Sequence, residues 1–323
     1  MRAAVREAFG SPDVVEVRDV EKPAPTDDEV LVRVRATSVN PADWYDVTGR
    51  PYVARPMTGL RGPKSERLGV DYAGTVEAVG TNVTEFEPGD DVFGGRNGAF
   101  AEYVVVKADR AIVSKPENVS FEQAAAVPIA ALTALQGLRD KGKLEPGESV
   151  LINGASGGVG TFAVQIAKAL GAEVTAVCST GNVEQARSLG ADQVVDYTRE
   201  DCTRGDRRYD LLLDIAGSWT WSDCRRILRR DGRLVVAGAP KGNRLLGPIG
   251  HVAKLRLASI LSWRRVVFFI AKFNKPDLET LRDLVASGRM TPVVDRRYDL
   301  SEISDALRYL GEGHARGKVV VTV

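Results

Sequence analysis

Cysteine and histidine are scarce in this 323-residue chain, and the first 177 residues contain neither. A zinc site normally takes Cys, His and carboxylate ligands, whereas oxygen ligands alone suit magnesium or calcium. The sequence therefore predicts that these residues bind no zinc. The three cysteines of the chain are Cys178, Cys202 and Cys224, and their odd number and wide spacing exclude a disulfide framework. Such cysteine usage favours a reducing, cytoplasmic location.

Long apolar runs are also absent. The most apolar stretch, residues 249–271, is interrupted by Lys254, Arg256, Arg264 and Arg265, so it has no window of about twenty apolar residues that would span a membrane. We expect this stretch to form a buried helix and strand. The first residues are too charged, and their apolar run is too short, for a secretory or transit signal.

Neither sign of charge dominates the chain. Lys and Arg number 44 against 43 for Asp and Glu, which gives a net charge of +1. This balance gives no electrostatic reason to expect nucleic acid or an anionic membrane as a partner. We therefore expect a small-molecule partner, with no nucleic acid and no membrane.

The first 120 or so residues have the pattern of short strands. Residues 30–36 alternate apolar and polar side chains, as a half-buried strand does. Turn signals recur between such segments, for example Glu87-Pro-Gly-Asp90 and Gly94-Gly95. Regularly spaced short strands predict a compact β-rich domain, either barrel-like or a folded sheet.

From residue 121 onward the pattern changes to alternating helices and strands. Residues 121–141 are alanine-rich and predict a helix that breaks or kinks at Pro128. Strands are expected at 148–153, 173–178, 193–196, 211–215, 233–237 and 266–270, with helices such as 158–170 and 182–189 between them. This alternation is typical of an α/β fold with a doubly wound parallel sheet. The tail, with helices at 277–287 and 301–310 and a strand at 318–323, is expected to fold back onto the first domain.

The sharpest motif is Asn153-Gly-Ala-Ser-Gly-Gly-Val-Gly160, between a predicted strand and a predicted helix. This context is the one that a dinucleotide-binding turn requires. Gly157 leaves room for a pyrophosphate to approach the backbone, and Gly160 allows close packing. The helix N-terminus adds free N–H donors and a partial positive charge. The expected cofactor-binding residues of this turn are Ala155, Ser156, Gly157, Gly158, Val159 and Gly160.

The end of the second strand bears on the choice of cofactor. A site for NAD usually has Asp or Glu there, which binds the ribose 2′-hydroxyl. Here Cys178 takes that place, followed by Ser179, Thr180 and Asn182, and no carboxylate follows before Glu184. A 2′-phosphate is then not repelled, and the two hydroxyls can donate to it, so the sequence predicts NADPH. Alternatively, Ser179 and Thr180 only cap the helix that follows.

Over nearly its whole length the chain resembles the medium-chain dehydrogenase/reductase superfamily, and within it the zinc-free quinone oxidoreductase branch. The segments that carry the resemblance are Ser38-Val-Asn-Pro-Ala-Asp43, Leu68-Gly-Val-Asp-Tyr-Ala-Gly74, Phe86-Glu-Pro-Gly-Asp90, Ala99-Phe-Ala-Glu-Tyr-Val104, Ala130-Ala-Leu-Thr-Ala-Leu135, the glycine-rich turn and Gly317-Lys-Val-Val320. The resemblance implies a GroES-like substrate domain (1–122 and 268–323) and a Rossmann domain (123–267). It also implies a homodimer.

Two positions distinguish this chain from the zinc-dependent members of the superfamily. Asn40 stands where those members have a cysteine ligand, and Val70 stands where they have a histidine. Neither side chain supplies a usual zinc ligand. A zinc alcohol dehydrogenase is therefore nearly excluded.

The resemblance also implies roles for individual residues. Asn40 and Tyr45 match polar positions near the nicotinamide and are the candidate catalytic residues, although Asn40 also fits a simple Asn-Pro turn and Tyr45 an amphipathic wall. Asp71 matches a carboxylate beside the missing zinc, or is a structural ion-pair partner. The remaining expected cofactor contacts are Thr133, Tyr197, Gly217, Gly238, Phe269 and Lys318; Thr133 is otherwise an ordinary helix residue, and Phe269 and Lys318 are otherwise core and surface residues.

These observations predict a zinc-independent oxidoreductase that transfers hydride from NADPH to a quinone or another electron-poor acceptor. The transfer leaves negative charge on an oxygen, which hydrogen-bond donors must stabilise in the absence of zinc. Two alternatives remain open: a reductase of enal or enone double bonds, and a non-catalytic NADPH-binding protein.

Overall fold

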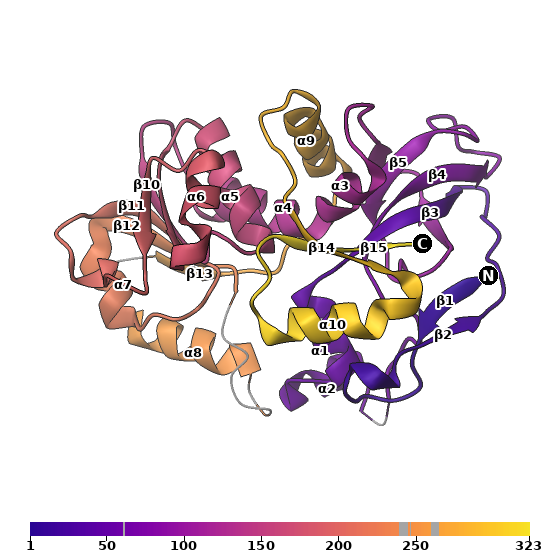
Figure 1. The fold of residues 1–323 in the computed structure, drawn as a ribbon, viewed down its shortest axis with the longest axis horizontal. Coiled ribbons are helices and arrows are strands. Elements are labelled where there is room, and N and C mark those ends of the chain that lie inside the picture. The colour runs from indigo at the N-terminus through magenta and orange to yellow at the C-terminus, as the bar shows by residue number, and fades with distance from the viewer. Residues whose placement is uncertain (61, 239–244, 246, 260–264) are drawn as a thin grey trace. The chain divides into compact units, whose positions relative to one another are not determined.

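The computed structural model describes residues 1–60, 62–238, 245, 247–259 and 265–323 (Figure 1). The chain forms two compact units. Unit 1 comprises Met1–Leu132 and Lys272–Val323, and unit 2 comprises Thr133–Ala271. The chain thus leaves unit 1 at residue 132 and returns at residue 272, whereas the sequence analysis placed these junctions at 122 and 268. In the described residues, no helix is both long and apolar enough to cross a membrane.

Unit 2 contains a six-stranded sheet whose strands are all parallel. In spatial order its strands are β10 (Gln193–Asp196), β9 (Glu173–Cys178), β8 (Ser149–Asn153), β11 (Tyr209–Asp214), β12 (Leu228–Val236) and β13 (Arg265–Phe268). Numbered along the sheet, this is the 3-2-1-4-5-6 order of the Rossmann fold. The predicted fold class is confirmed for this unit.

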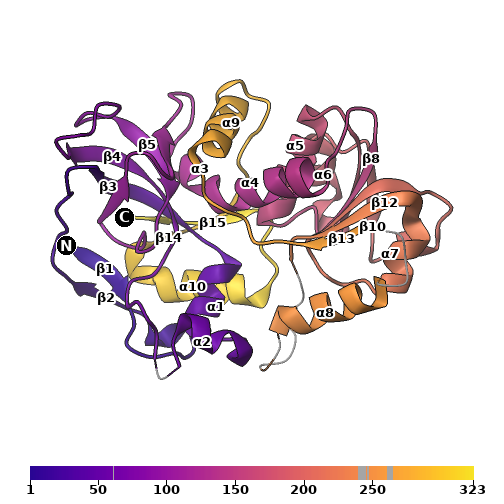
Figure 2. The same ribbon diagram turned by 180° about the vertical axis from the view of Figure 1, so that it is seen from behind.

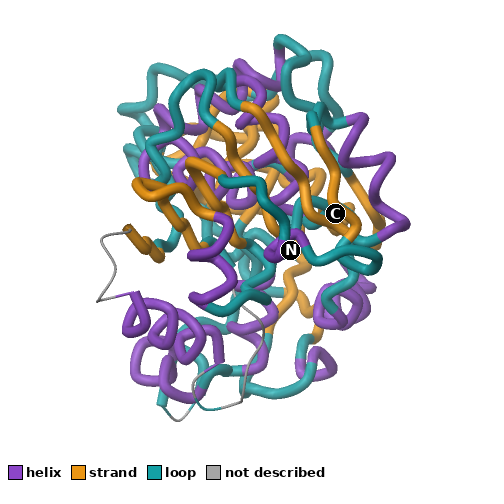
Figure 3. The backbone as a smooth tube through the Cα atoms, turned by 90° about the vertical axis from the view of Figure 1, so that its left-hand side faces the viewer, coloured by secondary structure: helices purple, strands orange, loops and turns teal. Residues whose placement is uncertain are grey.

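Helices connect these strands and cover the sheet, as can be followed in Figure 3. They are α5 (Gly158–Ala169), α6 (Val183–Ser188), α7 (Trp221–Ile227) and α8 (Gly247–Ser259). Helix α5 packs on β8 and β9. All five residues of β8 are buried, because both faces of a parallel sheet are covered.

The alanine-rich segment before β8 breaks at the position expected from its proline. Helix α3 (Phe121–Ala126) ends before Val127, α4 (Pro128–Leu135) starts at the proline, and a π-helical segment follows over Gln136–Lys141. Proline has no N–H to continue the hydrogen bonding of the preceding turn.

Unit 1 is built on a mainly antiparallel seven-stranded sheet. Its strands are β14 (Val294–Asp299), β15 (Lys318–Thr322), β3 (Glu29–Val39), β4 (Asp71–Val79), β5 (Asp91–Gly95) and β7 (Ile112–Ser114), in this spatial order, with β6 (Tyr103–Lys107) also paired to β3. A hairpin of β1 (Arg2–Val5) and β2 (Glu16–Asp19) forms a second, two-stranded sheet.

The tail of the chain completes unit 1. Strand β15 lies between β14 and β3 and pairs antiparallel with β3. Helices α9 (Lys275–Ala286) and α10 (Ile303–Glu312) flank these strands, and α10 packs against α1 (Pro41–Thr48), with α2 (Arg55–Thr58) next along the chain (Figure 2). Leu307 of α10 and Val321 of β15 are fully buried in one cluster with Val39 and Val47.

Helix α1 starts at a capping box. The backbone N–H of Asn40 donates to the Asp43 carboxylate at 2.8 Å. Asp43 is nevertheless almost completely buried. The pKa of Asp43 is raised to about 7, mainly by burial; the nearby Asp71 charge acts in the same direction, and the Asn40 hydrogen bond and the Lys318 charge act in the opposite direction.

The apolar stretch 249–271 forms a helix and a strand as expected, but its described part is only partly buried, and residues 260–264 lie outside the described residues. Leu255 is buried, and Val252 and Val266 pack against the same cluster. In contrast, Ile249, Leu257, Phe268 and Ile270 are exposed. Among the described strands β13 pairs only with β12, at the edge of the sheet, so one side of this strand lacks the cover that a core strand has.

The anchoring of the tail can be tested at Leu307. We expect Leu307→Ala to lower the free energy of unfolding by about 2–5 kcal/mol, because truncation leaves a cavity in a closed cluster. Leu60→Ala is the matched control in the same unit, since Leu60 is 73% exposed; it should stay within about 0.5 kcal/mol. Urea unfolding measures both, and equal effects would show that α10 is not anchored by this residue.

The buried Asp43 should make stability depend on pH. Its pKa in the folded protein, about 7, lies above the ordinary value of 3.8. The folded state therefore binds more protons than the unfolded state between these values, and stability falls as pH rises through 7. Between pH 5 and 8 we expect the wild type to lose on the order of 2 kcal/mol relative to Asp43→Asn. Urea unfolding of both proteins across this range is the measurement, and parallel curves would refute the assignment.

Candidate active site

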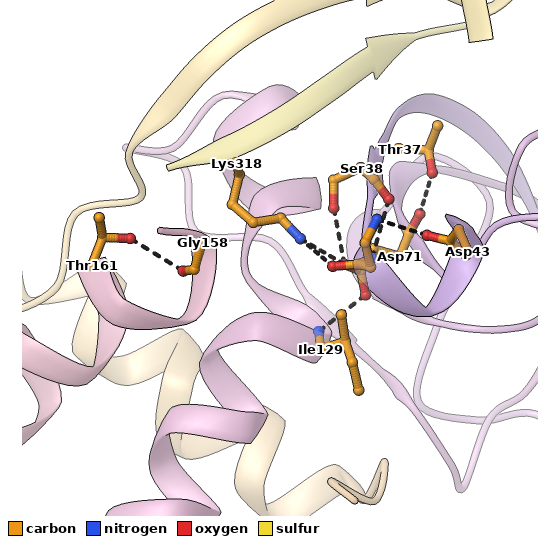
Figure 4. A network of polar contacts seen from close by, with 9 residues as sticks. Thr37, Ser38, Asp43, Asp71, Ile129, Gly158, Thr161 and Lys318 are labelled. Carbon is orange, nitrogen blue, oxygen red and sulfur yellow. Dashed lines mark hydrogen bonds and ion pairs between the residues drawn. The ribbon is translucent and has the colours of Figure 1, made fainter. Parts of the chain in front are cut away.

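Four buried polar side chains meet in unit 1 at adjoining ends of three strands (Figure 4). Ser38 and Asn40 come from the end of β3 and the residue after it, Asp71 begins β4, and Lys318 begins β15. Antiparallel pairing places Ser38 opposite Asp71 on one side and opposite Val320 on the other. Strand register thus brings together residues that are up to 280 positions apart in the chain.

Asp71 is the centre of this cluster. Its Oδ2 accepts hydrogen bonds from the Ser38 hydroxyl and from Asn40 Nδ2, both at 2.9 Å, and lies 3.4 Å from Lys318 Nζ. Its Oδ1 accepts from the backbone N–H of Ile129 at 3.0 Å. The carboxylate therefore joins β3, β4 and β15 to the first turn of α4.

Asn40 and Lys318 are held in turn by each other. Lys318 Nζ donates to Asn40 Oδ1 at 2.5 Å, and Asn40 Nδ2 also reaches the carbonyl of Ser38 at 3.3 Å. These contacts fix the orientation of the amide, with its oxygen toward the ammonium and its nitrogen toward the carboxylate. Both amide hydrogens of Asn40 then have acceptors within the protein.

Lys318 is 3% exposed, and burial lowers its pKa, although the charges of Asp71 and Asp43 oppose this shift. Burial disfavours the charged form of an amine because the protein interior solvates it less well than water does. The sequence analysis considered Lys318 a cofactor contact or a surface residue. The structure places it inside unit 1, so it is not a surface residue.

Tyr45, the other candidate catalytic residue, lies on α1 and is half-buried. Its ring packs edge-to-face on Trp44, with ring centres 5.3 Å apart. Partial burial raises the pKa of Tyr45, so the phenol stays protonated and able to donate at neutral pH. Among the described residues, no group of three or more His, Cys, Asp or Glu side chains is arranged to hold a metal ion.

In unit 2 the glycine-rich turn joins β8 to α5. Gly157 is the N-cap of α5 and no side chain caps the helix, which leaves N–H groups of the first turn open to a ligand. A Cβ at Gly160 would lie 2.1 Å from the carbonyl oxygen of Gly154, so only glycine fits. A Cβ at Gly157 would meet nothing closer than 3.7 Å, so this position opens onto free space. The turn therefore fits a pyrophosphate as the sequence suggested.

The loop after β9 holds Ser179, Thr180 and Asn182. Asn182 Nδ2 donates to the Ser179 hydroxyl at 2.9 Å, and Asn182 Oδ1 is buried with no partner among the described residues. Tyr197 follows β10, bonds through its N–H to the carbonyl of Cys178 at 3.1 Å, and is 62% exposed. The two loops therefore lie side by side at the carboxyl edge of the sheet.

Asp196 is the residue that sequence reasoning missed in this region. It ends β10, directly beside Cys178 in the parallel pairing. Thr180 Oγ1 donates to its Oδ2 at 2.6 Å, and these hydrogen bonds, together with those from Thr198, lower the pKa of Asp196. A carboxylate thus lies near the loop after all, supplied by the neighbouring strand. Its position immediately before Tyr197 was the available signal.

The other expected contacts in unit 2 lie at or near the strand ends. Gly217 N–H donates to Asp214 Oδ1 at 2.8 Å, and a Cβ at Gly238 would lie 2.0 Å from the Ile215 carbonyl oxygen. Phe269 follows β13, and its ring lies beside Gly137. Thr133 is half-buried on α4.

Two family models match the chain. One, described as an alcohol dehydrogenase GroES-like domain, covers residues 26–117, and the other, described as a zinc-binding dehydrogenase, covers residues 189–321. The first falls in unit 1 and contains β3 to β7. The second covers the later strands of unit 2 and most of the tail.

Curated relatives span most of the chain. A mitochondrial NAD(P)H oxidoreductase of Mus musculus is 36% identical over 91% of this chain and 82% of its own length. A chloroplast quinone-oxidoreductase homologue of Spinacia oleracea is 32% identical over 97% and 95%. A 2-methylene-furan-3-one reductase of Solanum lycopersicum is 31% identical over 97% and 76%.

Solved structures share the fold over the full chain. The quinone oxidoreductase of Coxiella burnetii superposes with a TM-score of 0.86 at 30% identity, covering 100% of this chain and 99% of that one. An NAD-dependent alcohol dehydrogenase gives 0.85 at 31% identity, and the Escherichia coli quinone oxidoreductase in complex with NADPH gives 0.81 at 25%, each with full coverage of both chains.

These matches confirm the family resemblance and the two-domain fold class, with a Rossmann-like and a GroES-like domain. The chain belongs to the medium-chain dehydrogenase/reductase superfamily, in its quinone oxidoreductase-like branch, and it is an oxidoreductase enzyme that uses a nicotinamide cofactor.

Proposed function

We propose that this protein is a zinc-independent, NADPH-dependent reductase of quinones or similar electron-poor acceptors. The observation that carries the proposal is the buried cluster around Asp71. Asn40 stands at the position of a zinc ligand in the zinc-dependent members, and the Lys318 ammonium lies 3.4 Å from the carboxylate. The buried ammonium beside Asp71 supplies the positive charge that a zinc ion supplies in the zinc-dependent members. The same charge would repel a zinc ion.

The residues of unit 2 fit the cofactor. Its pyrophosphate would lie at the turn 155–160, against the open N-terminus of α5, and its adenosine ribose near Ser179, Asn182 and Tyr197. Gly217, Gly238, Thr133 and Phe269 are proposed to border it further along. When bound, the cofactor supplies a hydride.

Asn40 and Tyr45 are proposed to face the acceptor from unit 1. Tyr45 keeps its proton and offers a phenolic donor to an oxygen that gains negative charge. Asn40 offers less, because both its amide hydrogens already have acceptors.

A second candidate function is the reduction of enone double bonds. The relative from Solanum lycopersicum is named as a reductase of a methylene-furanone, which is an enone. Reduction of a quinone and of an enone both place negative charge on an oxygen, so the same donors serve both reactions.

We also propose a homodimer, formed through the edge of β13 that pairs with no other described strand. Ile270, just after this strand, is 79% exposed, and Phe268 is 42% exposed. An apolar, unpaired edge strand is a template for pairing with a second chain. The cytoplasmic location stays a prediction. The relatives include one named as mitochondrial and one named as chloroplastic.

The proposed reaction is tested by following NADPH and NADH oxidation in chelator-treated buffer, with a small quinone and a small enone offered separately. We expect turnover with NADPH and at least one acceptor, and we expect the chelator to leave it unchanged. The reason is that the described residues include no group of three or more His, Cys, Asp or Glu side chains that could hold a metal ion. Activity that chelation removes and zinc restores would instead establish a zinc alcohol dehydrogenase. Cofactor binding without any oxidation would establish a non-catalytic binder.

Cofactor preference is tested at two positions of the adenosine loop. A new carboxylate in Ser179→Asp should repel a 2′-phosphate and shift the NADPH/NADH preference toward NADH by about tenfold, or about 1.4 kcal/mol. Asp196→Asn removes an existing charge beside Thr180 and should shift it the other way. The ratio of kcat/KM values for the two cofactors is the measurement, and an unchanged ratio in both variants would place the ribose elsewhere.

A further inference from the structure

The buried cluster of unit 1 is short of spare hydrogen-bond donors, with one exception. The Ser38 hydroxyl donates to Asp71, and the two hydrogens of Asn40 Nδ2 are directed at Asp71 and the Ser38 carbonyl. Lys318 carries three N–H donors. Two of them serve Asn40 Oδ1 and Asp71 Oδ2, which leaves the third without an acceptor among the residues that the structure describes.

Stability alone is a poor reason for this ammonium to be buried. Removing a charge from water costs several kcal/mol, and replacing a buried ion pair by apolar side chains is often neutral or stabilising. Burial is the largest cause of the lowered pKa of Lys318, and the charges of Asp71 and Asp43 act in the opposite direction. The lowered pKa reflects the cost of removing this ammonium from water. Buried, perturbed charges of this kind gather at functional sites.

We infer that Lys318 is the main electrophilic residue of the reaction, donating its third hydrogen to the acceptor oxygen that becomes negative. This inference rests on the proposed reductase function. Hydride transfer would break a C–H bond of the reduced cofactor, which is oxidised, and form a new bond to the conjugated system of the acceptor. The π electrons of the acceptor shift onto its oxygen, which becomes the C–O⁻ of a hydroquinone anion or an enolate, and solvent supplies the proton that completes the product. Lys318 stabilises the oxygen throughout and remains an ammonium.

Asn40 is then a positioning residue rather than the oxyanion donor. Its carbonyl oxygen holds Lys318 Nζ, and its nitrogen is fixed by Asp71. Asp71 in turn is fixed by Ser38 and by the first turn of α4. The ammonium is therefore held at two points, which leaves little freedom for its remaining donor, and such preorganisation is what makes a charge effective in stabilising a transition state.

The test compares wild type with Lys318→Met, with Lys115→Met as the matched control. Lys115 is another mostly buried lysine of unit 1, paired with Asp91 at 3.7 Å and outside the proposed site. We expect Lys318→Met to lower kcat by about 100-fold or more, the usual effect of losing one such donor. The dissociation constant for NADPH, from a fluorescence titration, should change less than about threefold in the same variant, whereas a direct cofactor contact would lose more.

A second comparison guards against a variant that fails because it leaves Asp71 unpaired. Asp71→Asn removes that charge, and the double variant Asp71→Asn/Lys318→Met is then neutral. We expect the double variant to turn over at least about 100-fold more slowly than Asp71→Asn alone. Methylammonium should restore part of the turnover of Lys318→Ala, because it supplies the missing donor, and a purely structural lysine would show no such rescue.

The outcomes separate the two proposals. Suppose that the wild type reduces quinones or enones. If Lys318→Met is as fast as the wild type, or the double variant as fast as Asp71→Asn, the role of Lys318 is overturned and the reductase function stays intact. A loss confined to NADPH affinity makes Lys318 a cofactor contact and also overturns this role. A wild type that binds NADPH and reduces neither acceptor overturns the proposed function, and the inference with it.

Discussion

The carboxylate of Asp71 is the constraint on which the candidate active site depends. It is fully buried, and its two oxygens receive hydrogen bonds or an ion pair from β3, β15, the residue after β3 and the start of α4. A buried carboxylate without partners would be very unfavourable, so each of these elements is held at a defined distance from it. The tail of the chain is tied to the first hundred residues by the same group, through Lys318.

This arrangement gives the proposed zinc independence a physical basis. Asn40 and Val70 leave no tetrahedral ligand set, and a lysine supplies one positive charge in the same cluster. An ammonium is a point charge with three directed donors, so its orientation has to be imposed by neighbours. Asn40 and Asp71 impose this orientation. Asp43 lies close enough to Asp71 and Lys318 for both charges to affect its raised pKa.

In unit 2 the site follows from the sheet. The carboxyl ends of parallel strands all lie at one edge of the sheet. The turn after β8 and the loops after β9 and β10 therefore lie together at that edge. The same geometry brings Asp196 from β10 to Thr180, so the hydroxyl that appeared free in the sequence already has an acceptor. The proposed preference for NADPH therefore depends on the Asp196 charge as well as on the Ser179 hydroxyl.

The sequence by itself determined the class of the fold, the order of its strands along the chain, the dinucleotide turn and the break at Pro128, because these depend on local periodicity, on glycine and on proline. It also singled out Asn40, Tyr45 and Lys318 as residues of interest. Only the tertiary structure decided what they contact. Strand register set Lys318 against Asn40 and Asp71, and parallel pairing set Asp196 beside Cys178. Such contacts join residues far apart in the chain, so no local pattern could reveal that the amide hydrogens of Asn40 are occupied and that the spare donor belongs to a buried lysine.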